Sequence, residues 1–314
     1  MSQRIGIIGA GISGLSAAQR LIAAGHAVDL FDKGRGPGGR MSTRRERIND
    51  TAYLFDHGAQ YFTVRDPRFV SQVEHWVQHG LAARWPDAGP DAFVGTPMMC
   101  SPLAHLCERF GVRFGTRITA ITGAPSAWYL RAENETFGPY AQVIVAIPSE
   151  QAADLLTPWA VDFAQTARAH PSQPCWTTMV SFSEDPPDLA PVMRIPGPVL
   201  AWVANNAAKP GRAKTSAWVL QATPDWTAAY IDLSREDAAA PMFAAWQALV
   251  SHPLPQPVLL KAHLWRYART GEGVDSLLYN KALGLGLCGD WLKGPRVEAA
   301  WLSGLELAEA LLAA

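Results

Sequence analysis

The sequence has few charged residues and few cysteines. Charged residues make up 18% of the 314 residues, and the formal net charge is −1. The sequence has no long basic run and no acidic tail, so nothing in it indicates a nucleic-acid partner or a membrane surface. The four cysteines form no CxxC pair, and no histidine cluster lies beside them. We therefore expect neither a zinc site nor a disulfide framework, and we predict no bound metal.

Long apolar runs are also missing. No run approaches the roughly 18 residues that span a bilayer. The N-terminus enters an apolar strand by Ile5 without the pattern of a signal peptide. These two absences lead us to expect a soluble, cytoplasmic protein. Apolar residues still make up 48% of the chain, which is enough for a sizeable core, and the length favours about two domains.

The N-terminal residues carry a nucleotide-binding pattern. The sequence predicts a buried parallel strand, a helix and a second strand over residues 4–9, 12–24 and 27–32. Gly9, Gly11 and Gly14 form a GxGxxG motif, which makes a tight turn, admits a pyrophosphate and lets the helix pack on the strand. Asp32 ends the second strand, where an acidic side chain accepts ribose hydroxyl groups. We predict a dinucleotide site; the alternative is a glycine turn that only packs the helix closely.

Two further segments favour FAD over NAD as the dinucleotide. Gly39 allows close backbone approach to a ligand, and Arg40 offers a forked cation to a pyrophosphate oxygen. The alternative for Arg40 is a solvated surface charge. Gly289 and Asp290 end a predicted strand before a helix at 296–312, so the carboxylate can bind a ribityl hydroxyl while the helix N-terminus faces a flavin pyrimidine. The alternative there is an ordinary strand–helix pair.

The remaining pattern predicts an α/β fold with two sheets. Helices are expected at 67–85, at 101–110 with Ser101 as the N-cap, and at 236–250; strands are expected near 112–122, 127–133, 141–147 and 284–289. The stretch 150–262 is predicted to form a mostly antiparallel sheet. We expect a two-dinucleotide-binding-type FAD domain, with a Rossmann-like parallel sheet, over residues 1–64, 97–149 and 264–314. A substrate domain is expected over residues 65–96 and 150–263.

These motifs resemble a known superfamily. GAGISGL, the acidic strand end, GGR and the C-terminal GD before a helix resemble the glutathione-reductase/amine-oxidase superfamily of flavoproteins. GGRMSTRR, FDHGAQYFT, WVANNAAKPGR and HLWRYA are similar to its renalase-type branch. The resemblance implies noncovalent FAD, hydride transfer to flavin N5, and reoxidation by dioxygen to hydrogen peroxide. It implies 1,2- and 1,6-dihydro isomers of NAD(P) as substrates.

The resemblance also implies a set of cofactor-binding residues. They are Gly9, Gly11, Gly14, Asp32, Lys33, Gly39, Arg40, Gly58, Ala59, Gln60, Ile118, Gly289, Asp290, Val297, Glu298 and Ala299. Cys288 is expected on a buried strand rather than at the flavin edge, so we do not expect it to tether the cofactor covalently.

The substrate site is expected to be aromatic and neutral. Oxidising a dihydropyridine gives an aromatic ring, so the chemistry needs orientation and oxygen access rather than a strong base. The catalytic candidates are Gln60, Trp202, Asn206, His263 and Tyr267, with Tyr61, Trp291 and Trp301 nearby. The aromatic residues can equally be core residues, and His263 a hydrogen-bonded structural histidine. Lys209 and Arg212 lie in a Pro-Gly loop, where they are solvated charges or meet a substrate phosphate.

Two other functions remain open on this scaffold. An amine oxidase or desaturase would need an aromatic cage and often a lysine near N5; Lys261 is close in sequence, but His263 is better placed. A non-enzymatic binding protein would resemble the GDP-dissociation inhibitors, which share the scaffold without flavin. The intact glycine motif, together with Asp32, Arg40 and Asp290, argues against it.

Overall fold

The computed structural model describes residues 2–314. One half of the molecule is built on a parallel sheet, with strands from both ends of the chain. The sheet order is β17-β18-β11-β1-β2. The parallel strands are β1 (Arg4–Ile8), β2 (Ala27–Phe31), β11 (Gln142–Val145) and β18 (Leu285–Leu287), and β17 (Leu278–Asn280) pairs antiparallel at one edge. Layers cover both faces, which explains the continuous apolar runs of these strands. The predicted Rossmann-like sheet is confirmed.

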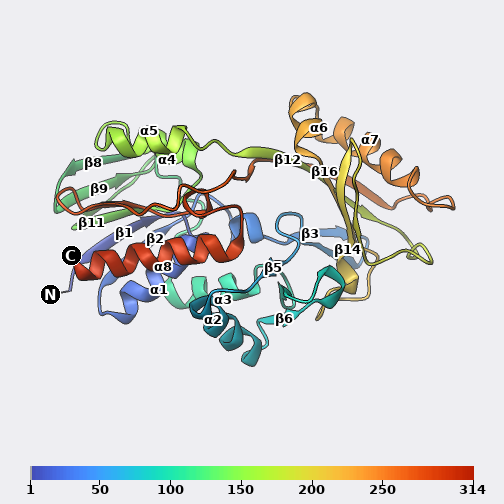
Figure 1. Cartoon of the computed structure of the whole chain (residues 1–314), viewed down its shortest axis with the longest axis horizontal. Helices are drawn as coiled ribbons and strands as arrows, with labels where there is room; N and C mark the ends of the chain where they lie inside the picture. Colours follow the sequence, from blue (N-terminus) through green and yellow to red (C-terminus); the bar gives the residue numbers. More distant parts are fainter. Residues whose placement is uncertain (1) are drawn as a thin grey trace.

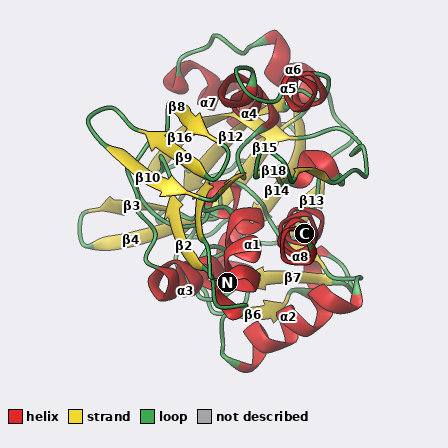
Figure 2. Ribbon diagram, turned by 90° about the vertical axis from the view of Figure 1, so that its left-hand side faces the viewer, coloured by secondary structure: helices red, strands yellow, loops and turns green. Residues whose placement is uncertain are grey.

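Helices and a small sheet form the two covering layers (Figure 1). On one side, α1 (Ile12–Ala23) packs on α8 (Val297–Ala313). On the other lie β8 (Ala120–Ala124), β9 (Ala127–Arg131) and β10 (Thr136–Tyr140), with α4 (Ser149–Leu156) and α5 (Val161–Arg168). Figure 2 shows α1 and α8 side by side. Gly14 permits the close approach of α1 to β1, because a Cβ at this position would overlap the carbonyl oxygen of Gly9.

The second half is built on an antiparallel sheet, as predicted. Its strand order is β13 (Val192–Arg194), β14 (Leu200–Asn205), β15 (Trp218–Ala222), β12 (Gln173–Ser181) and β16 (Leu259–Arg269). One face packs on α6 (Pro224–Ala229) and α7 (Arg235–Gln247) through a core that includes Trp176, Leu220 and Trp246. The opposite face packs on the ribbon β3 (Arg44–Ile48) and β4 (Thr51–Phe55), where Phe55 contacts the cluster of Met179 and Val219. This second face is turned towards the nucleotide half.

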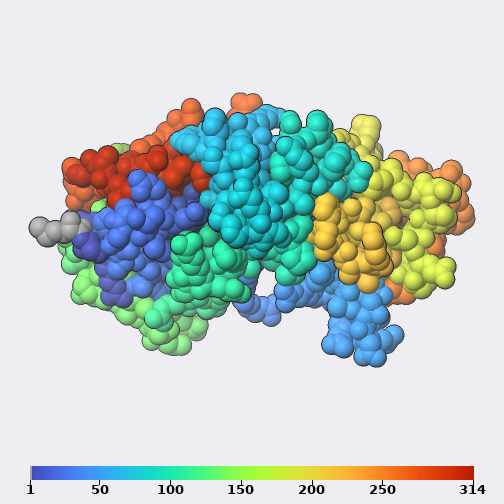
Figure 3. Space-filling view, turned by 90° about the horizontal axis from the view of Figure 1, so that it is seen from below, coloured from blue at the N-terminus to red at the C-terminus, as the bar shows by residue number. Residues whose placement is uncertain are grey.

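A third small sheet joins the two halves. It consists of β5 (Phe62–Thr63), β7 (Ala92–Gly95) and β6 (Ala82–Arg84), flanked by α2 (Pro67–Gln78) and α3 (Ser101–Phe110). In Figure 3 the cyan atoms of this region lie between the blue and red half and the yellow half. None of the helices within residues 2–314 has the length and apolar content needed to cross a bilayer.

The structure corrects three predicted boundaries. The helix expected over 67–85 ends at Gln78, because Gly80 adopts a left-handed φ of 69° and the chain returns as β6. Ser101 is not the N-cap of α3: Cys100 is, and the Ser101 hydroxyl accepts a hydrogen bond from Met98 N (3.0 Å). The strand expected from 112 begins only at Ala120; before it, Arg113 makes a single bridge to β2.

The domain boundaries stay a prediction. Helices α4 and α5 follow the expected boundary at residue 149. They nevertheless pack on the parallel sheet, on the face opposite α1 and α8. Strand β16 crosses the boundary expected between residues 263 and 264.

Candidate cofactor and substrate site

The GxGxxG turn lies at the carboxyl end of β1. Gly9 N donates to Phe31 O (2.7 Å), and the Asp32 carboxylate accepts from Ala10 N (2.9 Å) and Gly34 N (2.6 Å). Among residues 2–314, no side chain caps the first turn of α1, whose N-cap is Gly11. A Cβ at Gly11 would meet no atom within 4 Å, so space is open beside the helix N-terminus. Such a terminus attracts an anion through its free N–H groups and the helix dipole.

Arg40 and Asp290 meet beside this turn, although they lie 250 positions apart in the sequence. The guanidinium donates from Nη1 to Asp290 Oδ2 (2.8 Å) and from Nη2 to Oδ1 (2.6 Å), a bidentate pair. A Cβ added at the neighbouring Gly39 would lie 3.9 Å from the Cα of Gly11. Arg40 is therefore an ion-paired residue, and the alternative of a solvated surface charge is wrong.

These groups fit a dinucleotide cofactor. The carboxylate of Asp32, the open N-terminus of α1 and the Arg40–Asp290 pair provide acceptors for hydroxyl groups and a positive region for a pyrophosphate. Cys288 is fully buried, and burial raises the pKa of its thiol to about 12. A thiol in that environment is a poor nucleophile, which agrees with the expected absence of a covalent tether.

The remaining predicted cofactor residues lie in several different environments. Glu298 Oε1 accepts from Arg65 N (2.6 Å) and Asp66 N (2.8 Å), so this carboxylate holds the chain entering α2. Lys33 is exposed, and its ammonium donates to Gln151 Oε1 (2.9 Å). Ile118 is buried in the core under the parallel sheet. Val297 and Ala299 lie in the first turn of α8, which has no side-chain cap among the described residues.

Residues 56–61 connect the half that is built on the parallel sheet, called the cofactor half below, to the antiparallel sheet. Ala59 N donates to Arg40 O (2.9 Å), and a Cβ at Gly58 would overlap that same oxygen, so the segment lies directly against the Arg40 turn. From the sheet, Gln221 Nε2 donates to Gly58 O (2.7 Å) and Trp265 Nε1 donates to His57 O (2.8 Å). The segment is thus held between the two halves of the molecule.

One row of side chains crosses the antiparallel sheet opposite this segment. The strand register aligns Arg194 with Trp202, Trp202 with Gln221, Gln221 with Thr177, and Thr177 with His263. We call these five residues the cross-sheet row. A β-bulge between Leu200 and Trp202 turns Trp202 to this face.

The cross-sheet row contacts His57, Gly58 and Tyr61 of the segment. The amide of Gln221 reaches Gly58, as described above. The Trp202 ring lies 5.6 Å from that of Tyr61, and the His263 ring lies 5.0 Å from that of His57 (distances between centroids). Trp202 and His263 are therefore two predicted catalytic residues that the structure places on one surface, facing the cofactor half.

A buried ion cluster lies under the same segment. Asp56 Oδ2 accepts from Lys209 Nζ (3.1 Å) and Arg212 Nη2 (2.6 Å), and Asp56 Oδ1 accepts from the hydroxyl of Thr43 (2.6 Å). All three charged side chains have 0–1% exposure, so Lys209 and Arg212 are not solvated loop charges. The two cations hold the pKa of Asp56 well below its usual range, against the effect of burial. Burial lowers the pKa of Lys209 to about 8.

The ion cluster also orients Gln60. Lys209 Nζ lies 3.4 Å from Gln60 Oε1, while Gln60 Nε2 donates to the carbonyl oxygens of Asp56 and Gly58 (3.2 Å to Gly58 O). Both ends of this amide are engaged with the protein. Sequence reasoning missed the cluster because Asp56 and the 206–212 loop are far apart in the chain and each is polar by itself.

The two histidines of the site are neutral at neutral pH. Burial lowers the pKa of His57 to about 3 and that of His263 to about 4, with the positive charge of Arg44 adding to the effect. Within residues 2–314, the Nδ1 atoms of both rings are buried without a hydrogen-bond partner. The predicted hydrogen-bonded structural role is therefore not what the structure shows for His263.

Several other predicted residues lie outside the cross-sheet row. Asn206 accepts from Asp56 N (3.3 Å) and donates to Leu54 O (2.8 Å), so its buried amide fixes the backbone. The Tyr267 ring lies 6.0 Å from Lys33 Nζ, near the far end of β16. Trp291 and Trp301 are buried core residues, and Trp301 packs on Phe69.

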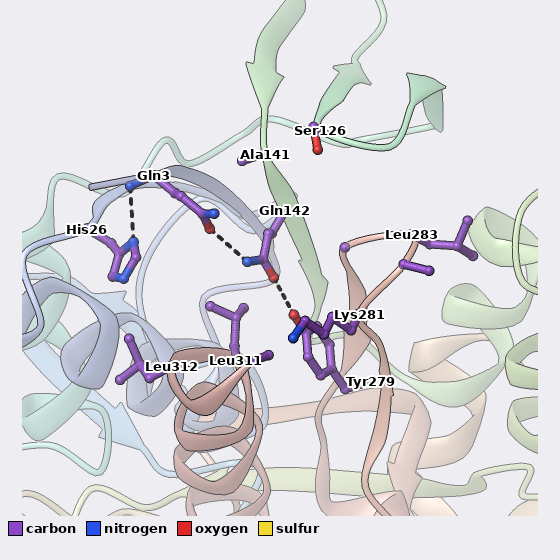
Figure 4. A pocket seen from close by; sticks show the side chains of 13 residues that line it. Gln3, His26, Ser126, Ala141, Gln142, Tyr279, Lys281, Leu283, Leu311 and Leu312 are labelled. Carbon is purple, nitrogen blue, oxygen red and sulfur yellow. Dashed lines mark hydrogen bonds between the residues drawn. The ribbon is translucent and has the colours of Figure 1, made fainter. Parts of the chain in front are cut away.

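A cavity of about 390 Å³ lies elsewhere, next to the C-terminus. Figure 4 shows its lining, in which Gln3, Gln142 and Tyr279 form a hydrogen-bonded chain. Gln142 begins β11, so this cavity is at the amino end of the parallel strands. Ligands of such sheets bind at the carboxyl ends, and we therefore do not assign the cofactor to this cavity.

Sequence comparison finds similarity in the N-terminal part of the chain. Residues 7–76 match the family described as the NAD(P)-binding Rossmann-like domain. The 4,4'-diapophytoene desaturase (4,4'-diaponeurosporene-forming) of Staphylococcus haemolyticus (strain JCSC1435) is 42% identical over 62 residues, which is 20% of this chain and 12% of that protein. The enzyme of the same name from Staphylococcus aureus (strain Newman) is 40% identical over 55 residues, 18% of this chain and 10% of that protein. The likeness thus covers about a tenth of these relatives.

Structural comparison covers the whole chain. A putative protoporphyrinogen oxidase from Exiguobacterium sp. 255-15 aligns with a TM-score of 0.75 at 12% identity, over 99% of both chains. A variant of putrescine oxidase gives 0.71 at 13% identity, and cyclohexylamine oxidase from Brevibacterium oxydans IH-35A gives 0.67 at 12%, each over 99% of both chains. These alignments show that the chain has the same fold as these oxidase structures.

Proposed function

We propose that the protein binds FAD noncovalently and acts as a flavin-dependent oxidoreductase. The Arg40–Asp290 pair beside Gly11 carries this proposal, because it joins motifs from both ends of the chain at one open helix N-terminus. The full-length likeness to oxidase structures supports it. When bound, the flavin would take hydride at N5 and pass the electrons to dioxygen, giving hydrogen peroxide.

Within this function, we propose dihydronicotinamide isomers as the substrates, namely 1,2- or 1,6-dihydro-NAD(P). The ring becomes aromatic when it loses hydride, so the site has to orient it rather than remove a proton. The neutral rings of His57 and His263 and the Tyr61–Trp202 pair suit that task. Held by Gln221 and Trp265, the 56–61 segment would keep these groups fixed relative to the cofactor half.

An amine oxidase or desaturase is the second candidate. Putrescine oxidase and cyclohexylamine oxidase share the fold, which favours it. Lys261, the lysine considered for a position near N5, is more than half exposed and pairs with Glu46 (2.8 Å). Arg194 stands over the Trp202 ring at 4.7 Å, and a cation there opposes the binding of an ammonium substrate. A non-enzymatic binding protein on this scaffold that binds no flavin would not need the open glycine turn.

One experiment separates these functions. The purified protein should be yellow, and acid precipitation should release the flavin into the supernatant. The oxidised protein is then mixed anaerobically with 1,2- and 1,6-dihydro-NAD(P), with ordinary 1,4-NADH and with primary and secondary amines, and flavin bleaching is followed by stopped flow. We expect fast bleaching by the isomers and much slower bleaching by the others. Bleaching by amines alone would favour the second candidate, and a colourless protein that does not take up added FAD would remove both flavin-dependent candidates.

A further inference from the structure

The cation Arg194 is held in place at one end of the cross-sheet row. Its guanidinium carbon lies 4.7 Å from the Trp202 ring centroid and 5.6 Å from that of Tyr61. Nη2 donates to Ala88 O (2.8 Å) and to the Tyr61 hydroxyl (3.3 Å). The side chain is nevertheless exposed, because β13 is an edge strand of the sheet. Arg194 is thus a solvent-accessible cation that the aromatic pair orients before any ligand binds.

The hydrogen bonds of Arg194 leave donors available. Both hydrogen bonds use Nη2, and Nη1 and Nε have no protein acceptor within residues 2–314. Guanidinium groups bind phosphate oxygens through paired N–H groups, and a guanidinium already held in place loses little conformational entropy on binding. The free donors of Arg194 are suited to a phosphate.

The surrounding charges favour an anion at this position. His263 and His57, at the other end of the row, are neutral at neutral pH. Below the 56–61 segment, the ion cluster contains one carboxylate and two cations, so it carries an excess positive charge. The cross-sheet row itself contains no carboxylate. An anionic substrate is therefore attracted to this surface and an ammonium substrate is repelled.

The spacing matches a nucleotide. Two strand spacings, about 10 Å, separate the backbones of Arg194 and Gln221. Gln221 holds Gly58 in the 56–61 segment, whose His57 and Tyr61 are among the groups proposed to orient the nicotinamide ring. A ribose joins a nicotinamide ring to its phosphate, and the ribose with an arginine side chain can bridge this span.

We propose that Arg194 is a specificity-determining residue that binds the phosphate of a dihydronicotinamide nucleotide. This inference rests on the proposed function. It requires the substrate to carry its phosphate, so that the free ring is bound much more weakly, and it assigns Tyr61 and Trp202 as the residues that position the cation.

The test compares two donors that differ in the phosphate. Wild-type protein, Arg194→Met, Arg194→Lys and the control Arg109→Met are mixed anaerobically with 1,6-dihydro-NAD or with phosphate-free N-methyl-1,6-dihydronicotinamide. Arg109 is a matched control because it is exposed and lies over Phe110 at 5.9 Å on α3, outside the row. The dependence of bleaching on donor concentration separates the dissociation constant from the limiting rate.

For Arg194→Met we expect a 10- to 150-fold higher dissociation constant for 1,6-dihydro-NAD, roughly the effect of losing a charge-assisted hydrogen bond. The limiting rate should stay the same, and the constant for the phosphate-free donor should change less than about twofold, a shift too small for a lost ion contact. Arg194→Lys should recover part of the affinity, and Arg109→Met should behave as wild type. Equal effects on both donors, or none on either, would overturn the inference.

A binding measurement makes the inference independent of turnover. Calorimetry with the oxidised holoprotein measures nicotinamide mononucleotide against N-methylnicotinamide, in wild type and Arg194→Met. The loss should again be confined to the nucleotide. If no donor bleaches the wild-type flavin, the proposed function fails. If the mononucleotide does not bind, or binds equally to the variant, the role of Arg194 fails instead.

Discussion

Two groups of buried ionisable side chains distinguish this site at the scale of single residues. One carboxylate, Asp56, pairs with two buried cations, and two neighbouring histidines remain neutral. Burying an ion costs several kcal/mol unless it is paired and hydrogen-bonded. Such groups are therefore sensitive to single substitutions, and each gives a prediction that can be measured without any substrate.

Asp56→Asn is expected to destabilise the fold strongly. The amide keeps the shape of the side chain but leaves Lys209 and Arg212 as buried cations facing each other without a counter-ion. Breaking a buried pair in this way costs about 3–5 kcal/mol. Urea unfolding followed by tryptophan fluorescence measures the loss. Lys261→Met is the control, because it removes an exposed ion pair worth less than about 1 kcal/mol. Similar stabilities for the two variants would contradict the prediction.

His57→Gln is expected to change how stability depends on pH. The folded protein keeps this ring neutral, with a pKa of about 3, whereas an unfolded histidine titrates near 6.5. Below pH 6.5 the unfolded state binds more protons, so the stability present above that pH is lost as the pH falls towards 3. From pH 7 to pH 5, the wild type should lose about 2 kcal/mol more than the variant. Urea unfolding at the two pH values tests this, and parallel losses would show that His57 does not contribute.

At the scale of elements, local patterns could be predicted and long-range pairings could not. The β1–α1–β2 unit follows from an apolar strand, a helical stripe and three glycines, and the helix observed is Ile12–Ala23. The cross-sheet row depends on the register of five strands, of which β13 and β16 lie far apart in the chain. No local signal fixes that register, so Arg194 was not among the predicted site residues. The ion cluster was missed because Asp56 and the 206–212 loop, far apart in the chain, meet only in the folded protein.

Alanine substitutions at two glycines of the turn before α1 should distinguish an effect on folding from an effect on cofactor binding. A Cβ at Gly14 would overlap the Gly9 carbonyl oxygen, so Gly14→Ala should cost about 1–3 kcal/mol or more through overpacking. A Cβ at Gly11 meets nothing within 4 Å, and its φ of −72° suits alanine. Gly11→Ala should therefore change stability by less than about 0.5 kcal/mol. Its methyl group nevertheless occupies the space proposed for the pyrophosphate.

The measurement compares the unfolding of the apoprotein with flavin retention for both variants. Retention is the ratio of absorbance at the flavin band to that at the protein band after desalting. Gly11→Ala should fold normally and retain less FAD. Normal retention in that variant would mean that the cofactor does not approach α1 at this residue.

At the scale of the whole molecule, the proposed site is assembled from both ends of the chain and from both halves. Asp290 follows β18, Arg40 follows β2, and the 56–61 segment connects them to the antiparallel sheet. The motifs at the two ends could be recognised in the sequence. Their meeting in a bidentate ion pair depends on the tertiary fold, because β11 and β1 separate β18 from β2 in the sheet and only the segments after these strands come together.

FAD binding should stabilise the protein as one unit, and Arg40 should be required for it. A ligand that binds only the folded state at 100 times its dissociation constant adds about 2.7 kcal/mol. We expect a single thermal transition of the apoprotein that moves upward as FAD is added. In Arg40→Met the transition should stay single, but the shift at the same FAD concentration should be much smaller, since a charged hydrogen-bond partner contributes about 1.5–3 kcal/mol. The matched control is Arg4→Met, which breaks the Arg4–Asp29 pair (2.7 Å) at the amino end of the same sheet. If Arg4→Met lost the shift and Arg40→Met kept it, the cofactor would have to bind away from the carboxyl ends of the parallel strands.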